Sequence, residues 1–104
     1  MTGIEMMPEL KAYDNPSVGD ATVSVAGRDK GRVFAVIEVL NGAYVLIADG
    51  KSRTVDKTKL KKTSHLRKLG ELKSYGTDDE LKKGLAEFNY DFSVLKARHY
   101  KPKG

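Results

Sequence analysis

The fold class follows from one segment, RVFAVIEVLNGAYVLIADG, which runs from Arg32 to Gly50. Its first nine residues, up to Leu40, are rich in β-branched side chains and almost continuously apolar, which is typical of a central strand covered on both faces. Asn41-Gly42 follows, and this dipeptide favours a type I′ turn, in which both central residues have positive φ. The segment from Ala43 to Ala48 is therefore predicted to return as the antiparallel partner strand.

The strand pattern extends to both sides of this segment. Apolar and polar residues alternate from Ala21 to Val25, as expected for a strand with one buried face and one exposed face. Asp49-Gly50 repeats the turn signal, so Ser52 to Val55 is predicted to form a fourth, shorter and more polar strand. A fifth short strand is a further candidate near His65-Leu66.

Four to five short antiparallel strands within residues 18–68 are too few for a sandwich and suit a small barrel, which removes its own edges by curling. The predicted fold class is therefore mainly β. Residues 1–17 contain a turn-rich YDNPS stretch and are expected to form a flexible N-terminal arm. Residues 69–104 are expected to form a helical C-terminal extension.

The predicted helix in this extension begins at a capping box. In Thr77-Asp-Asp-Glu80, the Thr hydroxyl can accept from a backbone N–H three residues on, and the Glu can reach back. Leu81, Leu85 and Phe88 follow at helical spacing, so one apolar stripe runs to about residue 89. A second helical turn is predicted around Phe92–His99.

Positive charge is concentrated in one part of the chain. The 104 residues hold 19 Lys and Arg against 14 Asp and Glu, a net charge of +5. The segment from Lys51 to Lys62 has one acid, Asp56, and holds six of the cations: Lys51, Arg53, Lys57, Lys59, Lys61 and Lys62. A concentrated basic excess indicates an anionic partner, with nucleic acid ahead of acidic protein or anionic lipid. The other interpretation is that these lysines keep a small domain soluble and protect a sheet edge.

A second basic group lies in the loop Gly27-Arg-Asp-Lys-Gly31. If this loop joins the first two strands, Arg28, Lys30 and Arg32 project from one end of the barrel. If residues 57–62 are extended, Lys57, Lys59 and Lys61 line one face, with Leu60 on the other. Arg can bind phosphate bidentately and Lys acts as a point charge, so such an array suits a phosphate backbone.

Catalysis has little support in the sequence. Neither His65 nor His99 has an acid within four residues, and the chain has no cysteine. No His or Asp/Glu cluster has metal-ligand spacing, and the Gly27–Gly31 loop lacks the nucleotide-binding glycine spacings. Asp78, Asp79 and Glu80 are explained by the start of a helix. We expect no enzyme activity, no catalytic or metal site and no cofactor.

The sequence also limits the cellular compartment in which the protein can be expected. The lack of cysteine excludes disulfides and fits a reducing compartment. The longest apolar run has six residues, whereas a membrane-spanning helix needs about twenty, and the first thirty residues contain no run that resembles a signal peptide. We therefore expect a cytoplasmic protein without membrane contact, and a monomer.

Several segments together carry a resemblance to a known family. Val18-Gly-Asp20, Val23-Ser-Val25 and Gly27–Gly31 resemble the KOW motif, in which hydrophobic-Gly-Asp leads a strand into a basic, glycine-containing loop. The similarity continues through Tyr44–Gly50, the lysine run that ends at His65-Leu66, and Gly76–Lys83. Over about residues 18–88 the chain is similar to KOW proteins related to the fourteen-e protein of the large ribosomal subunit, with a bacterial-type branch looking closest.

This resemblance implies an SH3-like barrel with a C-terminal helical appendage that contacts ribosomal or other structured RNA. Arg28, Lys30 and Arg32 correspond to the KOW loop, and the basic run with His65 matches in position and charge. The expected function is that of a non-enzymatic RNA-binding protein associated with the ribosome and translation. The alternative is a protein-interaction module that docks a transcription or translation factor through the barrel, using Phe34, Tyr44 or the helix stripe.

Overall fold

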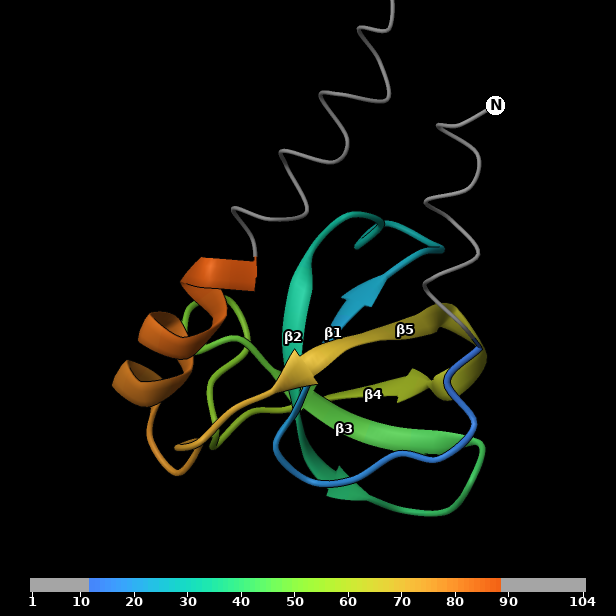
Figure 1. The fold of residues 1–104 in the computed structure, drawn as a ribbon, viewed down its shortest axis with the longest axis horizontal. Coiled ribbons are helices and arrows are strands. Elements are labelled where there is room, and N and C mark those ends of the chain that lie inside the picture. Colours follow the sequence, from blue (N-terminus) through green and yellow to red (C-terminus); the bar gives the residue numbers. More distant parts are fainter. Residues whose placement is uncertain (1–11, 89–104) are drawn as a thin grey trace, which may run out of the picture.

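A computed structural model describes residues 12–88 of the chain (Figure 1). A short 3-10 turn, η2 (Thr63–His65), separates the last two strands, and a helix begins at residue 78 and continues through residue 88, the last one described. The strands are β1 (Asp20–Ser24), β2 (Val33–Val39), β3 (Tyr44–Ala48), β4 (Lys59–Lys62) and β5 (Leu66–Glu71).

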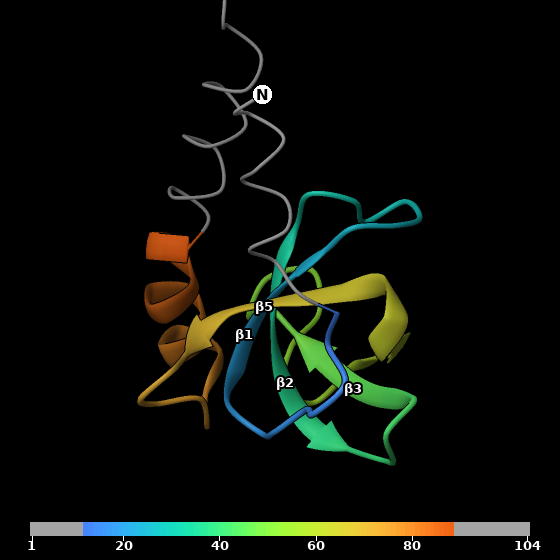
Figure 2. The ribbon, with the colours of Figure 1, turned by 45° about the vertical axis from the view of Figure 1, so that its right-hand side comes forward.

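All five strands belong to one antiparallel sheet with the order β4-β3-β2-β1-β5. The two outer strands, β4 and β5, are consecutive in the chain and are joined by η2, so the sheet curls round on itself (Figure 2). The register shifts in β1 and β2, and such irregularities increase local twist and bending. The predicted fold class, mainly β with a small barrel of four to five antiparallel strands and a C-terminal helix, is confirmed.

The first part of the central strand β2, Val33–Val36, is covered on both faces, as predicted, whereas Glu38 in its second part is exposed. Val33 and Ala35 pack into one core cluster, which includes Leu81 and Leu85 of the helix. Phe34, which is 1% exposed, points to the opposite face and belongs to a second cluster with residues of β3 and β5. The helix therefore covers one face of the sheet, and the curl of the sheet covers the other.

The expectation of an exposed polar face on β1 is wrong. Thr22 and Ser24 are as buried as their apolar neighbours Ala21 and Val23. Their hydroxyls donate to the carbonyl oxygens of Phe34 and Ala26, each at 3.0 Å. Buried hydroxyls are tolerated when they are hydrogen-bonded in this way, and simple alternation does not reveal such partners.

The turn after β2 is also different from the prediction. The β2–β3 hairpin is present, but neither Asn41 nor Gly42 has positive φ, so this is not a type I′ turn. Instead, the Asn41 side-chain oxygen accepts from the backbone N–H groups of Ala43 (2.7 Å) and Tyr44 (2.9 Å). These hydrogen bonds to the Asn41 side chain hold the turn in place of a type I′ backbone conformation. The loop between β2 and β3 is therefore longer than the two residues of a type I′ turn.

The predicted fourth strand at Ser52–Val55 is wrong. The N–H groups of Asp49 and Gly50 both donate to the carbonyl of Arg53, at 2.8 and 3.0 Å, so the chain reverses within five residues. The real fourth strand begins later, at Lys59, and the fifth reaches from Leu66 to Glu71.

The helix starts at the predicted capping box. The Glu80 N–H donates to the Thr77 hydroxyl (3.2 Å), and a Glu80 carboxylate oxygen accepts from the N–H of Gly76 (2.8 Å). The predicted stripe is confirmed, because Leu81 and Leu85 are buried in the core. The second helical turn predicted around Phe92–His99 lies outside the described residues.

Two glycines allow close packing between β5, the segment after it and the helix. A Cβ on Gly70 would lie 2.7 Å from the Phe88 ring, and one on Gly84 would lie 2.8 Å from Leu72. Real Cβ atoms do not approach other atoms so closely. Each glycine thus provides the space that one large apolar side chain fills.

The expected domain boundaries need adjustment at both ends of the barrel. Tyr13 is buried and donates its hydroxyl hydrogen to Asp20, and Ala12 forms a bridge with Arg67, so residues 12–17 pack on the barrel. Residues 1–11 of the expected arm lie outside the described residues. Strand β5 continues three residues beyond the expected limit at residue 68.

Candidate nucleic-acid interface

Arg32 connects the two loops that carry most of the predicted basic residues. These are the β1–β2 loop (residues 25–32) and the β3–β4 loop (residues 49–58). The Nη2 atom of Arg32 donates to Asp49 Oδ2 at 3.1 Å and to Ser52 Oγ at 2.6 Å. The guanidinium carbon also lies 5.5 Å from the centre of the Phe34 ring. The structure therefore brings the two predicted basic groups together.

Asp29 makes a second connection from the β1–β2 loop. Its carboxylate accepts from Lys59 Nζ at 2.5 Å and from Lys61 Nζ at 3.5 Å, both on β4. The hydrogen bond from Lys59 lowers the pKa of Asp29 below its ordinary value, and this effect outweighs the opposing effect of burial. One acid within a basic loop thus engages two of the predicted phosphate-binding lysines.

Strand β4 does not present a row of lysines to solvent. Lys61 lies opposite Val45, and Lys59 lies opposite Ile47, so both lysines share a face with buried apolar residues of β3. Lys61 is 8% exposed, whereas Leu60, on the other face, is 55% exposed. The predicted alternation, with Lys59 and Lys61 on one face and Leu60 on the other, is therefore present, but the register turns Lys61 toward the interior and Asp29 and not toward solvent.

The other predicted cations remain accessible. Six of them are exposed and form no ion pair with any residue between 12 and 88: Arg28, Lys30, Lys51, Arg53, Lys57 and Lys62. We call these six residues the basic surface. They come from the end of β4 and from the two loops that Arg32 and Asp29 connect.

Asp49 holds the start of the β3–β4 loop in shape. Its carboxylate accepts from the N–H groups of Lys51 (2.8 Å) and Arg53 (2.9 Å), from the Ser52 hydroxyl and from Arg32. Burial opposes ionisation, but these donors outweigh it and hold the pKa of Asp49 below its ordinary value. Asp49 is therefore an internally satisfied anion that orders the cations around it.

The same loop packs against the first turn of the helix. Val55 N–H donates to Asp78 Oδ1 at 2.9 Å. Gly50 has a φ of +82°, and a side chain there would clash with the carbonyl oxygen of Asp78 and come within 3.1 Å of Lys82 Cγ. This contact places the helix beside the β3–β4 loop (Figure 1).

A groove of about 250 Å³ lies where the two loops meet the helix. Three cations line it: Arg32, Lys51 and Lys82. Its remaining lining residues are Gly31, Val33, Asp49, Leu85 and Ala86. Lys82 was not predicted as a site residue. Its position next to Leu81 places it beside the buried stripe, but the sequence does not show which part of the barrel that stripe meets.

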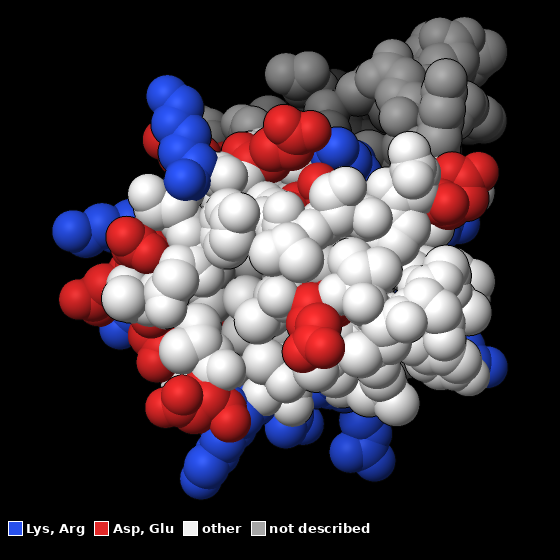
Figure 3. Space-filling model, turned by 90° about the horizontal axis from the view of Figure 1, so that it is seen from below, with Lys and Arg blue, Asp and Glu red and all other residues white. Residues whose placement is uncertain are grey.

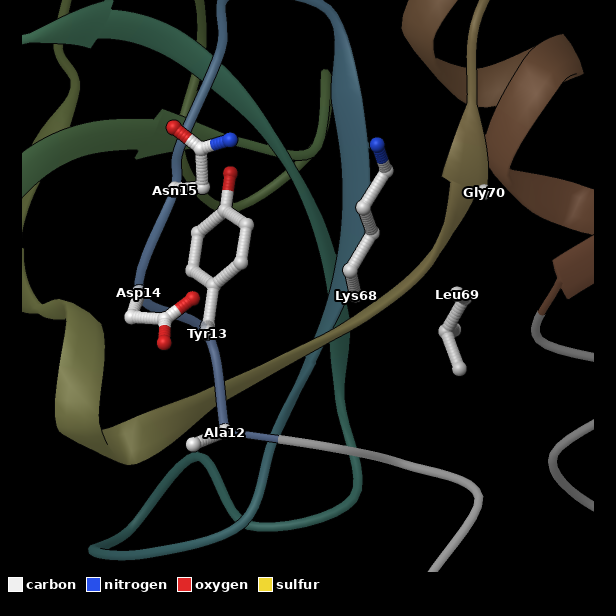
Figure 4. Close-up of a pocket in the computed structure, with 7 residues that line it drawn as sticks. All are labelled: Ala12, Tyr13, Asp14, Asn15, Lys68, Leu69 and Gly70. Atoms are coloured by element: carbon white, nitrogen blue, oxygen red, sulfur yellow. The ribbon is translucent and has the colours of Figure 1, made fainter.

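A second hollow, of about 400 Å³, lies over β5 and the segment before β1. It is lined by Ala12–Asn15 and Lys68–Gly70, and Figure 4 shows Lys68 across from Tyr13. Lys68 Nζ contacts Glu71 (2.8 Å) and Asp20 (3.3 Å), and the hydrogen bond with Glu71 is the main reason why the pKa of Lys68 is raised. The polar groups beside this hollow pair with one another and stabilise the fold, so their positions do not indicate a ligand.

Tyr13 belongs to this structural group. Burial, together with the hydrogen bond to Asp20 and its negative charge, raises the pKa of Tyr13 above its ordinary value. Asp20 Oδ2 also accepts from the N–H of Ser17 at 2.9 Å. In the part of the chain that the structure describes, every buried side-chain nitrogen or oxygen has a hydrogen-bond partner.

His65 lies in η2, between β4 and β5, and is half-buried. Its backbone carbonyl accepts from the N–H of Val25 at 2.9 Å. Between residues 12 and 88, no group of three or more His, Cys, Asp or Glu side chains is placed to hold a metal ion. The other histidine, His99, lies outside the described residues.

One face of the molecule is mostly uncharged. Figure 3 shows this face, at the foot of Figure 1, with acidic side chains near its centre and with both basic and acidic side chains at its margins. Over residues 12–88 as a whole, the exposed large apolar residues are Val18 (45%), Leu40 (46%), Leu60 (55%) and Tyr75 (37%). The Tyr75 ring lies over Gly19, where an added Cβ would come within 2.6 Å of it. Of the two aromatics named above as candidates for docking a protein partner, Phe34 is buried and Tyr44 is half-buried.

No protein-family model matches the sequence, and no curated protein matches it. No helix in residues 12–88 is long and apolar enough to cross a membrane.

Proposed function

We propose that this chain is a non-enzymatic RNA-binding module that holds folded RNA through phosphate contacts. The observation that supports this function best is the convergence of two basic loops. Residues 27–32 and 49–62 together contain nine Lys and Arg against three Asp, and Arg32 and Asp29 join these segments across the fold. A preformed surface with a large excess of positive charge favours a polyanionic partner.

The mechanism separates the cations into two groups. Arg32, Lys59 and Lys61 pair with Asp29 or Asp49 and fix the loops. The six residues of the basic surface stay available for phosphate oxygens. Arginines there can bind bidentately, while lysines act as point charges. Such contacts position RNA without reading its bases, so we expect recognition of RNA shape.

The resemblance to KOW proteins supports the choice of RNA and of the translation machinery. In that comparison Arg28, Lys30 and Arg32 correspond to the KOW loop, and His65 ends the matching basic run. We therefore propose ribosomal RNA, in the cytoplasm, as the first candidate partner. No cofactor is required for this function.

The test removes two lysines of the basic surface and compares them with two lysines elsewhere. Lys30→Gln/Lys51→Gln changes exposed residues of the joined loops. Lys73→Gln/Lys83→Gln makes the same charge change at exposed residues that form no ion pair within residues 12–88. Affinity for a structured ribosomal RNA fragment is measured for both variants over a range of salt concentrations.

The first variant should bind more weakly, and its slope of log affinity against log salt should fall in magnitude by about 1.4 to 1.8, because each lost phosphate contact contributes about 0.7 to 0.9. The control should keep most of the affinity. Equal losses in both variants, or an affinity that does not depend on salt, would contradict the proposal.

A second candidate function is that of a protein-interaction module. The mostly uncharged face in Figure 3 favours it, and so do the exposed apolar side chains of Val18, Leu40 and Tyr75. Sedimentation with ribosomes distinguishes the two. Release of the bound protein by ribonuclease supports RNA contact, whereas retention after ribonuclease supports docking on a protein.

A further inference from the structure

The groove between the β1–β2 loop, the β3–β4 loop and the helix combines positive charge with a concave shape. It shares Lys51 with the basic surface and adds Arg32 and Lys82. Its lining carries Arg32, Lys51, Lys82 and one acid, Asp49, so its net charge is +2. Its volume of about 250 Å³ lies below the 300–1,000 Å³ of pockets that enclose drug-sized ligands. It therefore suits a small anion of high charge.

The cations of the groove have donors to spare. Arg32 uses Nη2 for Asp49 and Ser52, whereas Nη1 is 3.9 Å from Asp29, beyond hydrogen-bond distance. A guanidinium has five N–H donors, and the Arg32 side chain is 48% exposed, so several donors remain for a ligand. Asp49 accepts from four groups, so its oxygens are occupied within the loop, and its negative charge is already counted in the net +2.

Lys82 is placed by the packing of its own stem. Its Cγ lies against Gly50, in the turn that also carries Lys51, so the two lysines flank one opening. The ammonium of Lys82 is 3.7 Å from Asp79, an i,i+3 pair in which the Asp79 side chain is 82% exposed. Pairs exposed to this degree contribute little energy and exchange easily. Lys82 can therefore turn to a ligand at small cost.

We propose that this groove binds a terminal phosphate of an RNA strand. A phosphate monoester carries a charge of about −1.5 to −2 and three strong acceptor oxygens, which match a net +2 site with three cationic groups. A phosphodiester inside a strand carries a single negative charge and matches the site less well. Val33, Leu85 and Ala86 offer apolar surface to the adjoining ribose. The inference rests on the proposed RNA-binding function, since the rest of the strand would follow the basic surface.

The experiment compares RNA strands of one sequence with a 5′-phosphate, a 3′-phosphate or hydroxyls at both ends. The wild-type chain should bind one phosphorylated form about tenfold more tightly than the hydroxyl form, as expected for added hydrogen bonds between charged groups. Lys82→Gln should reduce this preference to less than about threefold. Lys83→Gln, its neighbour on the same helix and not part of the groove lining, should retain it.

A second variant tests the groove without removing a cation. Ala86 is exposed at the groove, and Glu is a good helix former, so Ala86→Glu should fold and yet repel the phosphate. We expect it to abolish the preference for a phosphorylated end while the hydroxyl strand still binds.

The outcomes separate the two proposals. If RNA binds but shows no preference for either terminal phosphate, or if Lys82→Gln and Lys83→Gln keep the same preference, the groove assignment is overturned and the proposed function stands. If a phosphoserine peptide binds the groove more tightly than the phosphorylated RNA, the choice of RNA as its source is overturned. If the wild-type chain binds no RNA even at low salt, both proposals fail.

Discussion

Lys59 Nζ lies 2.5 Å from Asp29 Oδ2, although 30 positions of the chain separate the two residues. The same carboxylate oxygen also contacts Lys61. A single acid thus holds the β1–β2 loop to the edge strand β4. The basic surface depends on this acid, because it fixes the loop that carries Arg28 and Lys30.

Asp29→Asn should lower the free energy of unfolding by about 1 to 3 kcal/mol at neutral pH, because the substitution leaves the nearly buried ammonium of Lys61 without a counter-charge. The pKa of Asp29 is lowered in the folded state. Its contribution is therefore fully present above the ordinary value of 3.8 and is lost as the pH falls through the lowered value. Urea unfolding at a series of pH values should show the difference between wild type and variant closing on acidification. A difference that persists in acid would contradict this role.

Lys61→Gln and Lys62→Gln should separate stability from binding. Lys61 is buried and faces Asp29, whereas Lys62 is its exposed neighbour on β4. We expect Lys61→Gln to cost about 1 kcal/mol of stability, the typical value of one lost hydrogen bond, and to change RNA affinity little. Lys62→Gln should leave the unfolding midpoint unchanged and reduce the salt slope of RNA binding by about 0.7 to 0.9 in magnitude. If Lys61→Gln reduced the salt slope and Lys62→Gln lowered the stability, the inward position of Lys61 and the outward position of Lys62 would be wrong.

Tyr13→Phe should destabilise the fold by about 1 to 3 kcal/mol, because it removes a donor from the buried carboxylate of Asp20. Tyr75→Phe is the control, since the Tyr75 ring is partly exposed and its contact with Gly19 involves ring carbons. Chemical denaturation of both variants measures the difference. Equal stabilities would mean that the hydrogen bond from Tyr13 to Asp20 adds nothing to the stability of the fold.

Gly50→Ala should destabilise the protein by at least about 1 kcal/mol, because residue 50 has a φ of +82° and its Cβ would clash with Asp78. Gly42→Ala makes the same change at a glycine with no atom within 4 Å of the new Cβ, and it should be neutral or slightly stabilising. Thermal unfolding compares the two. If Gly50→Ala were as stable as Gly42→Ala, the close packing of the loop on the helix would be wrong.

The elements that could be predicted from the sequence are those with local causes. Strands β2 and β3 follow from short apolar runs, and the helix start follows from the capping box at Thr77 and Glu80. Each of these signals lies within a few residues of the structure that it specifies.

The errors have non-local causes. Thr22 and Ser24 are buried because their hydroxyls find backbone acceptors, and the segment after Asp49 turns because one carboxylate satisfies several donors. The inward position of Lys61 depends on an acid 32 residues earlier. Composition shows where the positive charge is concentrated along the chain, but only the register of β4 separates the lysines that stabilise the fold from those that face solvent.

The glycines under the helix also bear on how related sequences can change. Neither Gly70 nor Gly84 has positive φ, so each is required for the space it leaves to Phe88 or Leu72. An alanine at position 70 therefore needs a smaller residue than Phe at position 88, and the same reciprocity holds for positions 84 and 72. We expect the two residues of each pair to covary among homologues, because a larger residue at the glycine position requires a smaller one at its partner position.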